Sequence, residues 1–229
     1  MNGEEPSEGA PAPVRPVPGP PKHPLTQPVP VVAGDREAKP ARSKRRRSRR
    51  RRRGMPTRAV VLVGPMAAGK TSLGRQLAKE LGVPFVDTDA VFVRAHGAIA
   101  DFFASRGEEE FRRIEEEVIA EELARQGTRV VALGGGAVLS ARTRELLRAH
   151  PVVLLMTTQE AVLRTANIAR RPLLRDDPDA WGRILEARRP LYEEVADITF
   201  RTDRATKEQL TRRLAEWVRA GGRRSKERR

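Results

Sequence analysis

The chain has 229 residues, of which 45 are Lys or Arg and 30 are Asp or Glu, so its formal net charge is +15. It has no cysteine and only three histidines, which excludes disulfides, a thiol nucleophile and cysteine-ligated zinc and disfavours a histidine-rich metal site. No run approaches the roughly 18 apolar residues of a membrane span, and no apolar segment follows the start as in a secretory signal. We therefore expect a cytoplasmic protein with no membrane partner.

The positive charge is concentrated at the two ends of the chain. Residues 1–54 carry 14 basic and 5 acidic side chains and residues 219–229 carry 6 and 1, whereas residues 55–218 carry 25 and 24. The first 40 residues hold 11 of the 18 prolines and few large apolar side chains, so they cannot bury enough surface to fold. We predict a disordered extension over 1–54, one α/β domain over 55–218 and a disordered basic tail over 219–229.

Residues 44–53, KRRRSRRRRR, carry nine positive charges in ten positions. Like charges at this density keep a chain extended. The run is either a solvated tail without a partner or a salt-sensitive contact to nucleic-acid phosphates, without the aromatic side chains that stack on bases. A third reading is that Met55 is the true start, because domain-like sequence begins within three residues of it.

Short apolar runs alternate with helical patterns from residue 58 onward. Residues 58–63, RAVVLV, are typical of a strand buried on both faces, and leucines at every fourth position predict a helix that ends at Gly82. Further strands are predicted over 85–87, 130–133, 152–156 and 198–200, and further helices over 111–124, 141–149, 180–190 and 207–220. This alternation predicts a single α/β domain with a parallel sheet.

The strongest chemical signal is the segment 64–71, GPMAAGKT, between the first strand and the first helix. It fits the G-x-x-x-x-G-K-[ST] pattern of a phosphate-binding loop, or P-loop. Its main-chain N–H groups and the helix start favour phosphate, Lys70 should reach the β- and γ-phosphates, and the Thr71 hydroxyl should ligate Mg²⁺. We predict ATP binding by Ala67, Ala68, Gly69, Lys70, Thr71 and Ser72.

Two carboxylates, Asp87 and Asp89, flank Thr88 at the end of the second strand. Alternation along the strand would place both on one side at the carboxyl edge of the sheet, where ligands of α/β proteins bind. One would support a metal ion, and the other would accept a proton from a substrate hydroxyl. A pair of helix N-cap residues explains the same spacing equally well.

Three later segments each allow two interpretations. Glycines 134–136 expose backbone to a ligand or form a plain loop; no Walker-B aspartate stands there, which leaves Asp87 as the candidate. Residues 170–175, RRPLLR, are a lid that brings a cation to the phosphoryl group or a solvated loop. The arginine pairs 112–113 and 188–189 form surface ion pairs or grip a carboxylate.

In their order and spacing, these motifs resemble the shikimate kinase family. They are GPMAAGKT at 64–71, DTD at 87–89, FRRIE at 111–115, GGGAV at 134–138, RPLL at 171–174 and RPLY at 189–192. The resemblance covers residues 58–218 and implies a three-layer, nucleoside-monophosphate-kinase-like α/β fold with a five-stranded parallel sheet flanked by helices. It also implies transfer of the ATP γ-phosphoryl group to the 3-hydroxyl of shikimate, on the route to chorismate and aromatic amino acids.

The resemblance further implies a role for each matching residue on the nucleotide side. Lys70 and Arg171 would contact the ATP phosphates and act in catalysis, Arg171 from the lid. Thr71 would ligate Mg²⁺, and Asp87 would hold it through water. We expect a monomer that binds ATP and shikimate and needs Mg²⁺.

On the acceptor side, Asp89 matches the acid that contacts the shikimate hydroxyls and would be the catalytic base. Arg113 and Arg188 match the two arginines that hold the carboxylate. The backbone that contacts a hydroxyl would come from Gly134, Gly135 and Gly136.

Two departures from the family pattern leave alternatives open. Ala67 stands where the family usually has glycine, and if that position needs a positive φ the alanine costs about 1 kcal/mol. Ala205 follows Arg204 where an adenine-contacting arginine is common, so the adenine contact is undetermined. The alternatives are a gluconate-type or nucleoside-monophosphate kinase and a non-catalytic relative that binds nucleotide or nucleic acid.

Overall fold

The structure, a computed structural model, describes residues 55–165 and 179–222. The predicted extension over 1–54, the segment 170–175 and most of the predicted tail lie outside these ranges. Arg219 itself belongs to the folded part, because its guanidinium donates to the main chain and to the carboxylate of Glu80. None of the helices described is long and apolar enough to cross a membrane.

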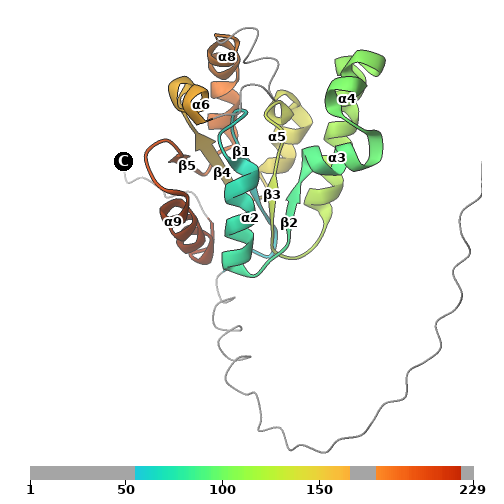
Figure 1. Ribbon diagram of the computed structural model, residues 1–229. Helices are drawn as coiled ribbons and strands as arrows, with labels where there is room; N and C mark the ends of the chain where they lie inside the picture. Colours follow the sequence, from blue (N-terminus) through green and yellow to red (C-terminus); the bar gives the residue numbers. More distant parts are fainter. Residues whose placement is uncertain (1–54, 166–178, 223–229) are drawn as a thin grey trace, which may run out of the picture. The chain divides into compact units, whose positions relative to one another are not determined.

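A five-stranded parallel sheet in the order β2-β3-β1-β4-β5 forms the centre of the domain (Figure 1). Its strands are β1 Ala59–Val63, β2 Phe85–Asp87, β3 Arg129–Ala132, β4 Val152–Met156 and β5 Ile198–Arg201. β1 lies in the middle, and all five of its residues are buried, as the run of β-branched side chains predicts. The fold class and the five-stranded parallel sheet are therefore confirmed.

Helices cover both faces of the sheet, which gives three layers (Figure 1). Val60 and Leu62 of β1 pack on one side with α2 (Lys70–Leu81) and α9 (Lys207–Arg219). Val61 and Val63 alternate to the other side and pack with α4 (Ile99–Ala124), α5 (Ala141–Leu147) and α8 (Ala180–Val195). Two hydrophobic cores thus hold β1 in place and fix the position of the loop that follows it.

The sequence pattern misses α3 (Thr88–His96), α6 (Gln159–Thr165) and the first half of α4. Here α3 and the first half of α4 lie beside β2 (Figure 1) and pack on each other through an aromatic cluster, whereas the second half of α4 packs on the sheet. The cluster contains Phe92, His96, Phe102, Phe103 and Phe111. Gly107, with φ 82°, interrupts the helical backbone of α4. The apolar residues before and after it therefore do not follow one continuous 3.6-residue repeat in the sequence.

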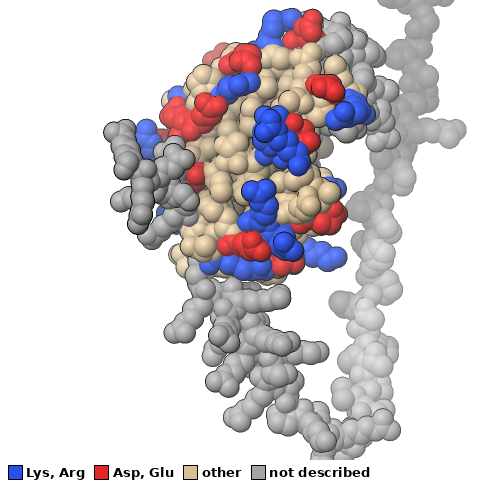
Figure 2. All heavy atoms as spheres, turned by 90° about the vertical axis from the view of Figure 1, so that its left-hand side faces the viewer, with Lys and Arg blue, Asp and Glu red and all other residues tan. Residues whose placement is uncertain are grey.

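The folded domain has charges of both signs on its surface. Figure 2 shows Lys and Arg interspersed with Asp and Glu on the face that includes α6, α8 and α9. Surface ion pairs such as Arg164–Glu160 and Arg189–Glu186 lie on these helices. This mixture fits the nearly balanced charge of residues 55–218.

Gly64, at the end of β1, provides a test of how tightly this loop is held. Its φ is +138°, and a Cβ built on it would lie 2.2 Å from the main-chain oxygen of Leu155 in β4. Gly64→Ala should lower the free energy of unfolding by about 3 kcal/mol or more, since strain and overpacking add. Chemical denaturation measures this.

Gly82 is the matched control, because its φ is +68° but a Cβ there would meet no atom within 4 Å. Gly82→Ala should cost only about 1 kcal/mol, the backbone term alone. Equal losses for the two variants would show that the close approach of β4 does not constrain Gly64.

Candidate active site

The P-loop between β1 and α2 has the backbone that phosphate binding requires. Gly69, with φ 86°, is the N-cap residue of α2 and has no side chain that could accept a hydrogen bond. No N-cap side chain therefore accepts from the first N–H groups of the helix, which face the loop. The Lys70 ammonium donates to the main-chain oxygens of Gly64 at 2.6 Å and Pro65 at 2.8 Å. A cation and a helix N-terminus therefore meet in one turn, which favours an anion.

Ala67 has a φ of +64° and is the one residue other than glycine with a positive φ in the ranges described. Position 67 therefore adopts the left-handed conformation, the case in which the sequence predicts a cost for alanine. A side chain in this conformation costs about 1 kcal/mol relative to glycine. The loop thus holds a strained residue beside the phosphate site.

Thr71 and Asp87 lie together at the carboxyl end of the sheet. The Thr71 hydroxyl donates to Oδ2 of Asp87 at 2.6 Å. The other carboxylate oxygen of Asp87 accepts from the main-chain N–H of Asp89 at 3.1 Å and of Ala90 at 3.4 Å, which makes Asp87 the N-cap of α3. The predicted alternation of Asp87 and Asp89 along one strand is therefore wrong, and the N-cap interpretation is confirmed for Asp87.

The two carboxylates nevertheless line one cavity, although a helix start rather than strand alternation brings them there. This cavity, about 350 Å³, also contains Lys70 and Thr71 and lies between the P-loop and β3. Burial raises the pKa of Asp89, the nearby Asp87 raises it further, and Lys70 and Arg112 partly oppose the shift. The cavity thus combines a carboxylate of raised proton affinity with a phosphate loop.

Arg112 lies against the glycine run 134–136 beside this cavity, whereas Arg113, the residue predicted to hold a carboxylate, does not. Arg113 is 55% exposed and pairs on its own helix with Glu110 and Glu117. Arg112 pairs at 2.6 Å with the buried Glu115, and its Nη1 would lie 2.3 Å from a Cβ built on Gly136. One residue along a helix turns the side chain by about 100°, which carries Arg113 away from the sheet.

The three glycines after β3 bring backbone and acidic side chains together. A Cβ on Gly134 would lie 2.6 Å from Oδ1 of Asp89 and 2.6 Å from Oε1 of Glu115, so a larger residue there would force these carboxylates to move. Burial raises the pKa of Glu115, and its ion pair with Arg112 opposes the shift. Gly134 and Gly136 thus leave room for the side chains of Asp89, Glu115 and Arg112, and a contact of this backbone with a ligand stays a prediction.

Arg188 and Tyr192 of α8 reach the same glycine run from the opposite side. The carbonyl of Gly135 accepts hydrogen bonds from the Tyr192 hydroxyl at 2.5 Å and from the Arg188 guanidinium at 3.2 Å. Tyr192 is 1% exposed, and burial raises its pKa. Arg188 thus lies at the glycine run, and its predicted contact with a carboxylate stays a prediction; Arg171 lies outside the described residues.

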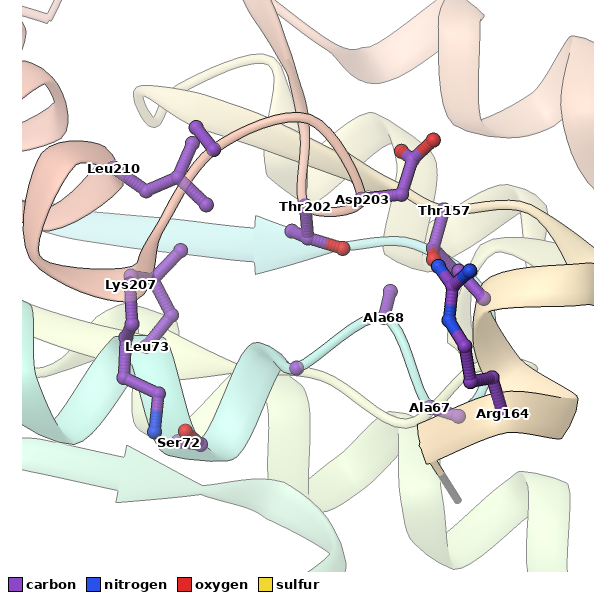
Figure 3. A pocket seen from close by; sticks show the side chains of 13 residues that line it. Ala67, Ala68, Ser72, Leu73, Thr157, Arg164, Thr202, Asp203, Lys207 and Leu210 are labelled. Carbon is purple, nitrogen blue, oxygen red and sulfur yellow. The ribbon is translucent and has the colours of Figure 1, made fainter.

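A second cavity of about 320 Å³ lies on the other side of the P-loop. Figure 3 shows the loop along one side, Arg164 from α6 at one end, and Lys207 and Leu210 from α9 at the other. Thr202 and Asp203, which follow β5, also line it. Its lining includes the predicted loop residues Ala67, Ala68, Gly69 and Ser72.

A family model described as shikimate kinase matches residues 66–219, more than half of the chain. A shikimate kinase from Streptomyces coelicolor is 48% identical over 155 residues, which cover 66% of this chain and 90% of that protein. One from Rhodococcus jostii is 43% identical over 165 residues, 68% of this chain and 97% of that protein. The chain belongs to the shikimate kinase family.

Solved structures of this family have the same architecture. The shikimate kinase from Acinetobacter baumannii, in complex with shikimate, is 38% identical with a TM-score of 0.67 and covers 75% of this chain and 96% of its own. That from Aquifex aeolicus is 27% identical with a TM-score of 0.61 and covers 71% and 99%. A gluconokinase from Sinorhizobium meliloti, 23% identical with a TM-score of 0.51, shares the fold alone.

Sequence reasoning missed Glu115, Tyr192 and Arg164. The sequence does contain a signal for Glu115 of α4, because Phe111, Glu115 and Ile119 recur at every fourth position and mark the buried face of that helix. Arg112, three residues before Glu115, lies beside that face, and Arg113 does not. Tyr192 follows Pro190 inside α8, and the helix predicted from the sequence ends at that proline.

The raised pKa of Asp89 generates a prediction about stability. Its ordinary value is 3.8, so the folded state holds the proton more tightly than the unfolded state, and the buried charge destabilises the fold above the folded-state pKa. Asp89→Asn should therefore raise the free energy of unfolding at neutral pH. The gain should shrink as the pH falls through the folded-state pKa, because wild-type Asp89 then becomes neutral.

Asp203 is a control of opposite sign, because its hydrogen bond to Arg201 lowers its pKa. Asp203→Asn should lower stability at neutral pH, and that loss should also shrink on acidification. Urea unfolding midpoints measured at neutral pH separate the two variants by sign, and a series carried below the ordinary aspartate pKa of 3.8 follows how both effects shrink. A destabilised Asp89→Asn protein would contradict the assignment.

Proposed function

We propose that the chain transfers the γ-phosphoryl group of ATP to the 3-hydroxyl of shikimate, giving 3-phosphoshikimate for aromatic amino acid biosynthesis. The observation that carries this proposal is one cavity that joins the P-loop to Asp89, with Arg112 and Arg188 at its edge. An anionic donor, an acid near a hydroxyl and cations for a carboxylate are what this reaction needs. Membership of the shikimate kinase family supports the same assignment.

ATP fits the arrangement of the two cavities. Its phosphates would lie on the N–H groups of the P-loop and the start of α2, beside Lys70. The base and ribose would enter the cavity in Figure 3, where Arg164 is available to stack on a base and Thr202 to accept or donate a hydrogen bond. These two side chains are our proposal for the adenine contact that the sequence left undetermined.

The donor set at Thr71 and Asp87 fits Mg²⁺. A hydroxyl and a carboxylate 2.6 Å apart supply hard oxygen ligands. Over the residues described, no group of three or more acidic or histidine side chains could hold a metal by itself. Mg²⁺ commonly takes its remaining ligands from phosphates and water. When bound, the ion would neutralise charge on the β- and γ-phosphates.

Shikimate would lie between β3 and α4, in the part of the cavity next to Asp89. Its carboxylate would be held by Arg112 and Arg188, with Arg112 replacing Arg113 in the role first predicted. Asp89, kept partly desolvated, would orient the 3-hydroxyl and accept its proton. The main chain of the glycine run 134–136 would contact a hydroxyl.

Little covalent chemistry falls to the protein in this reaction. Phosphoryl transfer is accelerated mainly by positioning and by neutralising the charge on the equatorial oxygens, to which Lys70 contributes. Within the described residues no second cation at the γ-phosphate is assigned, and Arg171 keeps that role as a prediction. A monomeric state, a cytoplasmic location and a nucleic-acid contact through 44–53 likewise stay predictions.

The reaction is tested by coupled ADP release with purified full-length chain. Shikimate should be consumed in a Mg²⁺-dependent manner, whereas gluconate and nucleoside monophosphates should support less than about 1% of that rate. Lys70→Met should reduce turnover at least about 100-fold, since it removes the cation beside the phosphates. ADP release with gluconate at a comparable rate would overturn the proposal.

The two neighbouring arginines form a matched pair for the carboxylate. Arg112→Ala should raise the KM for shikimate by about 100-fold with little change in the KM for ATP, because a buried charge partner of the substrate is lost. Arg113→Ala should leave both KM values within about two-fold, since its ion pairs are exposed. The reverse pattern would return the role to Arg113.

A further inference from the structure

Trp181 connects the opposite layer of the fold to the P-loop. It lies in the first turn of α8, is 2% exposed, and donates its indole N–H to the main-chain oxygen of Met66 at 3.1 Å, across 115 positions of sequence. Met66 and Ala67 pack against the core cluster that contains Trp181. The contact therefore reaches the strained turn of the loop from outside the nucleotide cavities.

The acceptor of this bond belongs to the peptide that determines the φ of Ala67. In a trans peptide the carbonyl and the N–H point in opposite directions, so the N–H of Ala67 points away from Trp181. Rotating the Met66–Ala67 peptide as a unit would change ψ of Met66 and φ of Ala67 together. Such a flip would relieve the positive φ of +64° at Ala67, and it would also break the bond to Trp181.

A flipped peptide would be incompatible with a bound triphosphate. Ala67 lines both cavities beside the P-loop. A flip would exchange its N–H for the carbonyl of Met66 and present a negative dipole end to the phosphates. Since alanine favours the flip more than glycine does, a P-loop with alanine at this position needs an external restraint.

We propose that Trp181 is a positioning residue that holds the Met66–Ala67 peptide in its phosphate-binding orientation and so offsets the absence of glycine at position 67. The inference rests on the proposed binding of ATP. Trp181 touches no reacting atom in it and acts through the loop. Its effect should thus appear in nucleotide affinity and in its coupling to Ala67.

The first test compares two tryptophans. Trp181→Phe keeps an aromatic ring and removes the N–H donor, and it should raise the KM and Kd for ATP by about five-fold, the usual range of one lost hydrogen bond, with the KM for shikimate unchanged. Trp217 is the matched control, because its indole N–H is buried and has no hydrogen-bond partner among the residues described. Trp217→Phe should leave both constants unchanged.

The deciding test is a double-mutant cycle with Ala67→Gly. Glycine makes the positive φ acceptable, so Trp181→Phe should change ATP affinity by less than about two-fold in the Ala67→Gly protein. The same coupling should appear without nucleotide. Ala67→Gly should raise the unfolding midpoint more in the protein that keeps Trp181 than in the Trp181→Phe protein. Additive effects in both measurements would overturn the inference.

These readouts separate the inference from the proposed function. If wild-type protein fails to bind ATP, the proposed function falls, and the unfolding cycle still decides whether Trp181 and Ala67 are coupled. If Trp181→Phe does not fold, wild-type protein gives the answer through indole hydrogen exchange. ATP should then slow exchange at Trp181 more than at Trp217, by reciprocity of the two equilibria. Equal slowing would overturn the inference.

Discussion

The position of the P-loop depends on the close approach of Gly64 to β4. Because β1 is buried on both faces and ends against the carbonyl of Leu155, the loop begins at one defined point between β3 and β4. Asp89 and the glycine run 134–136, which follow β2 and β3, then lie on the side proposed for the acceptor. Thr202, after β5, lies on the other side with the nucleotide cavity. The strand order thus places one cavity on each side of the P-loop.

The acceptor side joins charges that would be unstable apart. Burial raises the pKa values of Asp89 and Glu115, and Arg112 opposes both shifts. Glu115 in turn holds the Arg112 guanidinium at 2.6 Å, against a glycine with no side chain to displace it. A buried carboxylate that is paired in this way costs stability less than a lone one, and it holds a cation beside the glycine run.

The sequence was sufficient where one local interaction decides the structure. The buried strands, the P-loop and the helix that follows it were predicted because β-branched runs, glycines and a four-residue leucine repeat each have one stable solution. The sequence did not determine how Asp89 is positioned, because Asp87 both ends β2 and caps α3. The spacing of the two aspartates fits a continued strand and a helix start equally well. The choice between Arg112 and Arg113 depends on which face of α4 is buried, which the break at Gly107 obscures.

The two halves of the site differ in what they require of the sequence. The gluconokinase that shares the fold shows that the sheet and its helices are not tied to one acceptor. In the proposed function, specificity for the acceptor comes from side chains of α4 and α8, such as Arg112 and Arg188, whereas the nucleotide side depends on backbone geometry. Backbone geometry tolerates a residue such as Ala67 only where packing holds it, and in this chain the bond from Trp181 of α8 lies at that peptide. In these two proposals the same helix serves both substrates by different means, Arg188 through its guanidinium for shikimate and Trp181 through its indole N–H for ATP.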